Sequence, residues 1–134
     1  MAKREWRRVK PLTKEQKAEI AAICDRFIAE SLKPRFLPQI RPTEFNYPVD
    51  ITGKWRGHRY SFIVRYRSGF PETRDQEFDA PFVRLDHCEN LMDPPRFDVM
   101  WLRHTGKWWP LYDGCTLEEA LALMQREEVL KPPT

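Results

Sequence analysis

Long apolar runs are missing from this sequence: no stretch of consecutive hydrophobic residues exceeds five, the length of Ala120–Met124. A helix that crosses a lipid bilayer needs about 20 apolar residues, so a helical transmembrane protein is excluded and we expect no membrane partner. The first ten residues are basic, but the apolar segment that a secretory signal requires does not follow them. We therefore expect no such signal.

Cysteine is scarce, and its spacing excludes the usual small cysteine-rich folds. Cys24, Cys88 and Cys115 are an odd number and form no C-x-x-C pair, which suits neither a disulfide framework nor a zinc ribbon. Free thiols are most simply kept in a reducing compartment, so we expect a cytoplasmic protein. The simplest interpretation of each cysteine is a buried thiol that packs as a small apolar residue.

Histidine is equally scarce, and its placement does not predict a metal site. His87 and Cys88 are neighbours at the end of a predicted strand, where adjacent side chains point to opposite faces of the sheet. A zinc site needs three or four convergent ligands. His58, His87 and His104 cannot supply them together with the cysteines, so we expect no metal.

Glycine is rare too: the five glycines are isolated and form no G-x-x-x-x-G-K-[ST], G-x-G-x-x-G or G-x-S-x-G motif. Phosphate-binding loops and the hydrolase nucleophile elbow are therefore excluded. Cys115 directly precedes Thr116 at the start of a predicted helix, where the helix dipole should lower the thiol pKa. Because no histidine is near it in sequence, the pattern favours a simple helix entry, and we expect neither an enzyme nor a cofactor.

The length and charge distribution predict one domain with a basic arm. The chain has 134 residues, of which 41% are hydrophobic and 32% charged, which is typical of a single soluble domain. Residues 1–10 carry five basic residues against Glu5, a net charge of +4, so the other 124 residues sum to −1. We divide the chain into a basic arm at 1–12, an α+β domain at 13–130 and a tail at 131–134.

The arm has two interpretations. Its cations could contact nucleic acid or an acidic partner, and the candidates for that role are Arg4, Arg7, Arg8 and Lys10. A solvated terminus is the simpler alternative.

Two capping boxes predict a helix at each end of the domain. Thr13 and Gln16 begin the first helix, which should extend to about Leu32 and be ended by Pro34. Thr116 and Glu119 begin the second, at residues 116–128. The apolar stripes follow helical spacing and comprise Ile20, Ile23, Cys24, Phe27 and Ile28 in the first helix and Leu117, Leu121 and Met124 in the second.

Between the helices the hydrophobic period changes to two, which predicts strands. Residues 33–48 form a proline-rich connector, and five strands follow at 49–55, 60–67, 81–87, 97–104 and 107–112. The short connections require an antiparallel meander, so the fold class is α+β: an N-terminal helix, a five-stranded sheet and a C-terminal helix in a two-layer sandwich. Pro110 cannot donate to a strand ladder, so the fifth strand should lie at an edge.

The last hairpin determines which side chains share a sheet face. A two-residue turn at Thr105-Gly106 places Leu102 opposite Trp109. Opposed residues share a face, which predicts a helix-covered face of Met100, Leu102, Trp109 and Leu111. The opposite face would then hold Phe97, Val99, Trp101, Arg103, Trp108 and Tyr112.

An aromatic and basic sheet face is the candidate functional surface. If Arg65 and Arg84 of the neighbouring strands join this second face, the candidate binding residues are Trp101, Arg103, Trp108, Tyr112, Arg65 and Arg84. Tryptophan, tyrosine and arginine are enriched at protein interfaces, which favours a protein partner or a homodimer. The alternative is single-stranded nucleic acid, with bases stacked on the aromatics and phosphates on the arginines and the arm. A third interpretation is that the arginines only cover the tryptophans.

The segment Trp101-Leu-Arg103-His-Thr-Gly-Lys107-Trp108 spells W-x-R-x-x-x-K-W, with Tyr112 beyond it. This resembles the C-terminal hairpin of a small uncharacterised bacterial domain family, in which a leading helix is followed by antiparallel strands. The resemblance covers residues 97–112 and, elsewhere, only the order of the elements. It implies the same α+β fold and carries no activity.

Overall fold

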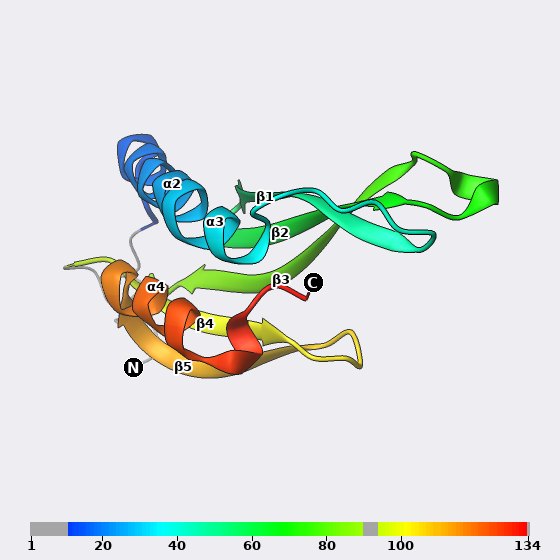
Figure 1. The fold of residues 1–134 in the computed structure, drawn as a ribbon. Coiled ribbons are helices and arrows are strands. Elements are labelled where there is room, and N and C mark those ends of the chain that lie inside the picture. The colour runs from blue at the N-terminus through cyan, green and yellow to red at the C-terminus, as the bar shows by residue number, and fades with distance from the viewer. Residues whose placement is uncertain (1–10, 90–93, 134) are drawn as a thin grey trace.

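The computed structural model describes residues 11–89 and 94–133 (Figure 1). The helical elements on the N-terminal side are α2 (Lys14–Phe27), a π-helical turn at Ile28–Leu32 and α3 (Lys33–Phe36). The strands are β1 (Asn46–Arg56), β2 (Arg59–Ser68), β3 (Glu77–His87), β4 (Arg96–Leu102) and β5 (Trp108–Thr116). The chain ends with α4 (Leu117–Arg126) and a 3-10 turn at Glu128–Leu130, and a further 3-10 turn, Pro71–Thr73, lies between β2 and β3.

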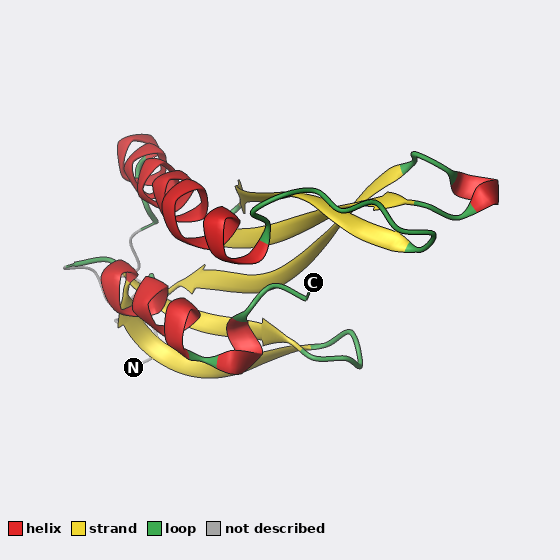
Figure 2. Cartoon of the chain, viewed as in Figure 1, coloured by secondary structure: helices red, strands yellow, loops and turns green. Residues whose placement is uncertain are grey.

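The strands form one antiparallel sheet in the order β1-β2-β3-β4-β5, so each strand pairs with its neighbours in sequence. Both helical layers lie on the same face of this sheet, with α2 over β1 and β2, and α4 over β4 and β5 (Figure 2). We call this face the inner face and the opposite one the outer face. The predicted α+β architecture, with a helix at each end of a five-stranded meander, is confirmed.

The helices begin where the capping boxes predict. Thr13 and Gln16 exchange backbone and side-chain hydrogen bonds at 2.9 and 3.1 Å, and Thr116 and Glu119 do so at 2.9 and 3.2 Å. No helix in the described part of the chain is long and apolar enough to cross a bilayer.

The prediction that Pro34 ends the first helix is wrong. The helix widens into a π turn at Ile28–Leu32 and continues through Pro34 to Phe36. In the π turn Lys33 N–H bonds to the carbonyl of Ile28, five residues back. Pro34 therefore stands in the first turn of α3, where its missing N–H costs little.

The core is built on the inner face. Phe62, Val83, Leu85 and Val99 are completely buried in adjacent strands. α2 and the π turn contribute Ile20, Cys24, Ile28 and Leu32, and the C-terminal segment contributes Ala120, Leu123, Met124 and Leu130. Phe27 and Leu121, predicted as stripe residues, are only partly buried against this core, and Ile23 is 40% exposed.

The C-terminal residues extend the core beyond α4. Pro132 is buried, and the Tyr66 hydroxyl of β2 donates a hydrogen bond to the carbonyl of Pro133. Residues 131–133, assigned to a tail from the sequence, therefore pack against the domain.

The predicted pairing of the last hairpin is wrong by one residue. The turn contains three residues, because Arg103 N–H bonds to Lys107 O at 3.0 Å and Gly106 N–H bonds to Arg103 O at 2.8 Å. Gly106 has φ +83°, as the last residue of such a loop requires. Trp109 consequently pairs with Trp101, and Trp108 pairs with Leu102.

Relative to β4, this shift turns the side chains of β5 over. Trp108 and Trp109 stay on the faces predicted for them, whereas the β4 residues lie on the faces opposite to those predicted. Phe97 and Val99, predicted on the binding face, are completely buried in the core. Met100 and Leu102, predicted to meet the helices, lie on the outer face with Arg84, which pairs with Met100. A register shift between Val99 and Met100 then pairs Tyr112 with Val99, so Tyr112 joins Leu111 on the inner side.

The prolines of the sheet stand where a missing donor is tolerated. Pro110 lies in β5 at one edge, as predicted, and Pro48 lies in β1 at the other. Pro81 is in the central strand β3, but a β-bulge opposite Phe62 and Ile63 accommodates it.

Gly53 of β1 is required by the core. It faces Phe62 across the ladder, and a Cβ atom there would lie 2.7 Å from Cε1 of Tyr60, an overlap that only movement of the ring can relieve. Tyr60 is itself buried between Trp55 and Phe62.

We therefore expect Gly53→Ala to lower the free energy of unfolding by about 1–3 kcal/mol, as overpacking of a core does. Lys54→Ala, at the exposed neighbouring position of the same strand, is the control and should change it little. Urea denaturation of both variants measures the difference. An unchanged unfolding midpoint for Gly53→Ala would show that Tyr60 moves without cost.

Candidate functional site

The structure does not bring the six predicted binding residues onto one face. Trp101 and Tyr112 lie on the inner face and pack against the core. The Tyr112 hydroxyl donates to Oε1 of Glu127 at 2.8 Å. Trp108, Arg84 and Arg65 lie on the outer face. The expectation that Trp101 and Trp108 share a face is therefore wrong, because the hairpin loop is one residue longer than predicted.

Arg103 belongs with the inner tryptophans. Its guanidinium carbon lies 5.9 Å from the ring centre of Trp101 and 5.4 Å from that of Trp109. Trp109 itself is 51% exposed. Arg103 therefore covers the paired indoles at the open end of the hairpin, which is the covering role considered for arginine above.

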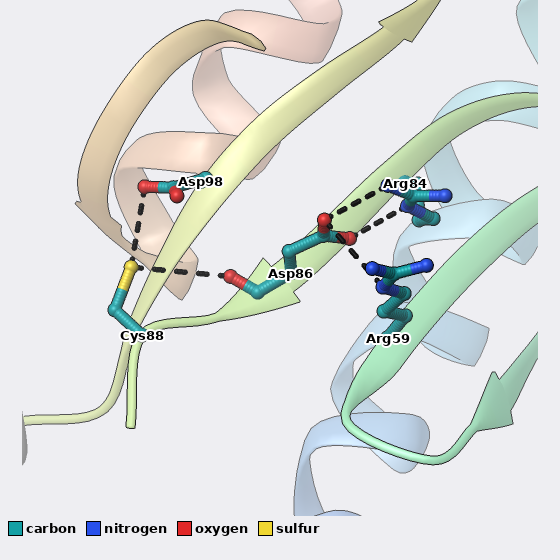
Figure 3. A network of polar contacts seen from close by, with 5 residues as sticks. All are labelled: Arg59, Arg84, Asp86, Cys88 and Asp98. Atoms are coloured by element: carbon teal, nitrogen blue, oxygen red, sulfur yellow. Dashed lines mark hydrogen bonds and ion pairs between the residues drawn. The ribbon is translucent and has the colours of Figure 1, made fainter. Parts of the chain in front are cut away.

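An ion pair occupies the middle of the outer face. Arg84 and Asp86 are two residues apart on β3 and so share a face, and they form a bidentate pair at 2.7 and 2.9 Å (Figure 3). Their side chains are only 13% and 17% exposed, although no helix of the described chain covers this face. Arg59 of β2 lies 3.7 Å from the same carboxylate.

Trp108 shields this pair. The guanidinium carbon of Arg84 lies 4.6 Å from the ring centre of Trp108, within the range of a cation–π contact. Met100, Leu102 and Trp108 are partly buried around it, and Pro110 is exposed. Apolar side chains and a paired guanidinium thus adjoin on one half of the outer face.

Asp98 faces Asp86 across the β3–β4 ladder. Two carboxylates directly opposite each other repel, and separate partners offset this repulsion. Oδ1 of Asp98 accepts a hydrogen bond from the Cys88 thiol at 3.2 Å (Figure 3). The same oxygen accepts a second hydrogen bond from the Gly114 backbone N–H at 3.0 Å. Asp98 therefore links β4 to β5 and to the segment after β3.

The thiols are held protonated. Burial, followed by the hydrogen bond to Asp98, raises the pKa of Cys88 to about 12. Burial and the neighbouring carboxylate of Glu119 also raise the pKa of Cys115, so the expectation that the helix start lowers it is wrong. A protonated thiol is a poor nucleophile. Among the described residues, no three histidine, cysteine or acidic side chains converge as a metal site needs.

Two further arginines of the outer face, Arg65 and Arg67, are paired with acids across the β2–β3 ladder. Arg65 bonds to Asp79 at 3.0 Å and Arg67 to Glu77 at 2.8 Å. The candidate phosphate-binding residues Arg65 and Arg84 thus each have a carboxylate partner. The pattern was hidden in the sequence because the register that opposes these residues depends on the β-bulge at Pro81.

Sequence reasoning missed a second apolar surface, at the long end of the β2–β3 hairpin. This end projects beyond the helices (Figure 1). Phe45 and Phe70 are 61% and 38% exposed, and their ring centres are 5.8 Å apart. In the sequence, the signal for this close approach is the glycine at position 69. The structure shows why glycine is needed there, because a Cβ atom would lie 2.8 Å from the carbonyl oxygen of Phe45.

The four arm residues predicted to contact a partner, Arg4, Arg7, Arg8 and Lys10, lie outside the described residues.

Loss of the outer-face carboxylate should leave Arg84 without its partner in a mostly buried place. We expect Asp86→Asn to lower the free energy of unfolding by about 1–3 kcal/mol. Asp79→Asn removes the matching partner of the exposed Arg65 and should have little effect, since exposed ion pairs contribute little. Equal losses in urea denaturation would mean that the burial of the Arg84–Asp86 pair has no energetic consequence.

His87 gives the domain a pH dependence. It is buried beside Phe97, and its Nδ1 has no hydrogen-bond partner among the described residues. Burial lowers the pKa of His87, and His58 and the positive charge of Lys17 lower it further. The carboxylate of Glu89 opposes this shift without cancelling it. The folded state therefore binds a proton less readily than the unfolded chain. Its contribution to stability is complete above the unfolded pKa, about 6.5, and declines as the pH falls below it.

We expect the unfolding midpoint of the protein to fall between pH 7.5 and pH 5.5, and His87→Phe to reduce this fall. His104→Gln, in the exposed hairpin loop, should retain it. Thermal melts at the two pH values measure the change, and a slope that is the same in His87→Phe and the parent would contradict the role of His87.

The resemblance suggested by the sequence agrees with the comparison to known families. No curated protein and no solved structure matches the chain at a significant level. A family model described as a domain of unknown function, DUF3024, matches residues 5–129. Since this match spans nearly the whole chain, including both helices and all five strands, the chain belongs to the DUF3024 family.

Proposed function

We propose that this domain is a non-enzymatic protein-binding module and that its contact surface is the outer sheet face around Trp108, Met100 and Leu102. The observation that carries the proposal is the mostly buried Arg84–Asp86 pair with Trp108 stacked on it. Such an arrangement combines an aromatic side chain, a guanidinium and apolar neighbours, the residue types that dominate binding energy at protein interfaces.

The charge of the face favours protein over nucleic acid. Arg65, Arg67 and Arg84 are each paired with a carboxylate. Nucleic-acid binding depends on cations that neutralise phosphates and release counterions, so arginines already neutralised by acids contribute little to it. A protein partner, in contrast, can cover this face without leaving a charged group unpaired, because these arginines already have carboxylate partners.

Single-stranded nucleic acid remains the second candidate because of one local feature. Lys54, Arg56 and Arg59 are exposed on the outer face at the β1–β2 turn. Among the described residues, Lys54 and Arg56 have no acidic partner within 4.0 Å. Binding through these cations would decline steeply with salt.

Site-specific photocrosslinking in cells tests the protein-binding proposal. A benzophenone amino acid at Leu102, on the outer face, should give discrete protein adducts, and Trp108→Ala should reduce them at least several-fold. Val129, which is 43% exposed near the C-terminus and not on the sheet, is the matched control position and should give none of these adducts. If the adduct is a second copy of the chain, the interaction is self-association.

Two results would overturn the proposal. One is the same adducts from Leu102 and Val129, or adducts that Trp108→Ala leaves unchanged. The other is tight binding of single-stranded DNA or RNA at physiological salt that a Lys54→Ala, Arg56→Ala variant loses, measured by fluorescence anisotropy. Sedimentation of the parent and Trp108→Ala proteins measures in parallel whether removal of the indole changes the mass of the sedimenting species.

A further inference from the structure

The turn of the β4–β5 hairpin carries positive charge that no carboxylate of the described chain offsets. Its basic residues are Arg103, His104 and Lys107, and no aspartate or glutamate occurs in residues 99–112. Among the described residues, no carboxylate lies within 4.0 Å of Arg103 or Lys107. Arg65 and Arg84 of the outer face, in contrast, each have a carboxylate partner. The turn therefore offers two cations to an anion of another molecule.

Arg103 and Lys107 stand opposite each other. The backbone N–H of Arg103 bonds to the carbonyl of Lys107 at 3.0 Å, one step beyond the pair of Leu102 and Trp108. Like charges directly opposite each other destabilise an antiparallel pair. Unlike the opposed carboxylates of the outer face, these two cations have no partner among the described residues that offsets the repulsion. An anion that contacted both would remove it.

The guanidinium of Arg103 is held in place without being satisfied. Its carbon lies 5.9 Å from the ring centre of Trp101, which packs against the core, and 5.4 Å from that of Trp109. Its Nε is buried and has no hydrogen-bond partner in the described chain, which is uncommon for a buried polar atom. Contact with the rings fixes the position of the guanidinium but leaves its in-plane N–H groups unpaired. Those are the groups with which arginine binds a carboxylate.

An accessible apolar surface adjoins the two cations. Trp109 is 51% exposed, and its pairing with Trp101 puts it on the same side of the hairpin as Arg103. The loop between β4 and β5 projects past the end of α4, so another molecule can approach it (Figure 1). Tryptophan beside arginine is the combination found most often at the energetic centres of protein interfaces.

We propose that this side of the hairpin turn binds an acidic segment of a partner protein. Carboxylates of the segment pair with Arg103 and Lys107, and an apolar side chain next to them packs on the exposed indole of Trp109. The contact lies on the opposite side of the hairpin from Trp108 and does not depend on the outer-face proposal.

The small extent of the positive charge favours a peptide over a nucleic acid. Beyond the turn, the inner-face positions of the hairpin that follow Trp109 carry no cation. The next charged group on this side is the carboxylate of Glu127, which accepts a hydrogen bond from Tyr112 at 2.8 Å. A single strand presents a phosphate at every nucleotide and needs a continuous track of cations. A segment with a few carboxylates needs only the turn.

A random dodecapeptide library displayed on phage tests the chemistry of the partner. The library is first depleted on the Arg103→Gln, Lys107→Gln variant and then selected on the immobilised full chain. We expect the retained peptides to be enriched in aspartate and glutamate next to an aromatic or aliphatic residue. Retention of no peptide, or of peptides without acidic residues, would overturn the proposal.

A charge reversal separates binding from a purely structural role of the turn. Lys107→Glu should weaken binding of the most enriched peptide several-fold, measured by fluorescence anisotropy of a labelled synthetic copy. The same change should raise the thermal midpoint of the free protein, because the new carboxylate stands opposite Arg103. Lys54→Glu makes the same change of charge at an exposed position of the outer face and should retain binding. Trp109→Ala should weaken binding without changing the charge.

Equal affinities of the parent and Lys107→Glu proteins for the peptide would contradict the site, as would equal losses in Lys107→Glu and Lys54→Glu. Tight binding of an oligothymidylate at physiological salt that Lys107→Glu abolishes would replace the acidic peptide by a single strand. Because Leu102 lies on the other side of the hairpin, each of these results is distinguishable from the crosslinking result on the outer face.

Discussion

Burial of one face of a five-stranded sheet is the constraint on which the other features depend. Tyr60, Leu85 and Val99 form a continuous buried row across adjacent strands, and both helical layers cover the face to which this row belongs. Because side chains alternate along a strand, this row forces Ser61, Arg84 and Met100 onto the opposite face. The outer-face ion pair is thus fixed in place by the core behind it.

The same alternation explains why so polar a surface is stable. Arg84 and Asp86 cannot turn into the core without moving Leu85 out of it, so they must be satisfied where they stand. A bidentate geometry, the stacked Trp108 ring and the second cation of Arg59 together satisfy them. Asp98 meets the same need through the Cys88 thiol and a backbone N–H. The thiol is consequently a structural donor, and its pKa is raised by burial first and by this hydrogen bond second.

Sequence reasoning reached the fold but not the division of the faces. The capping boxes at Thr13 and Thr116, the change of hydrophobic period and Pro110 predict the element order and an edge strand, because each of these signals is local. The face of Trp108 depends on whether the last loop has two or three residues. Thr105-Gly106 permits both, because Gly106 adopts a positive φ in either. One residue of loop length therefore decided the candidate site, and the wrong choice placed Trp101 and Trp108 together.

Pairings across strands were equally inaccessible. The partners of Arg65 and Arg67 follow from the β2–β3 register, which a bulge at Pro81 displaces by one residue. The π turn that carries the first helix through Pro34 has no sequence signature comparable to a capping box. Both irregularities accommodate a proline, and at Pro34 the local rule that proline ends a helix gave the wrong result.

The edges of the sheet indicate how the domain can make contacts. An open edge strand offers unpaired backbone groups to another strand. β5 carries Pro110, which has no N–H to offer, and β1 carries Pro48 together with an ion pair at 2.8 Å between Asp50 and Lys33 of α3. Pairing of a partner strand along either edge is therefore disfavoured. Among the described residues both helical layers lie over the inner face, which is why the protein-binding proposal assigns the contact to the outer face, where the aromatic and guanidinium contact needs no rearrangement of the fold.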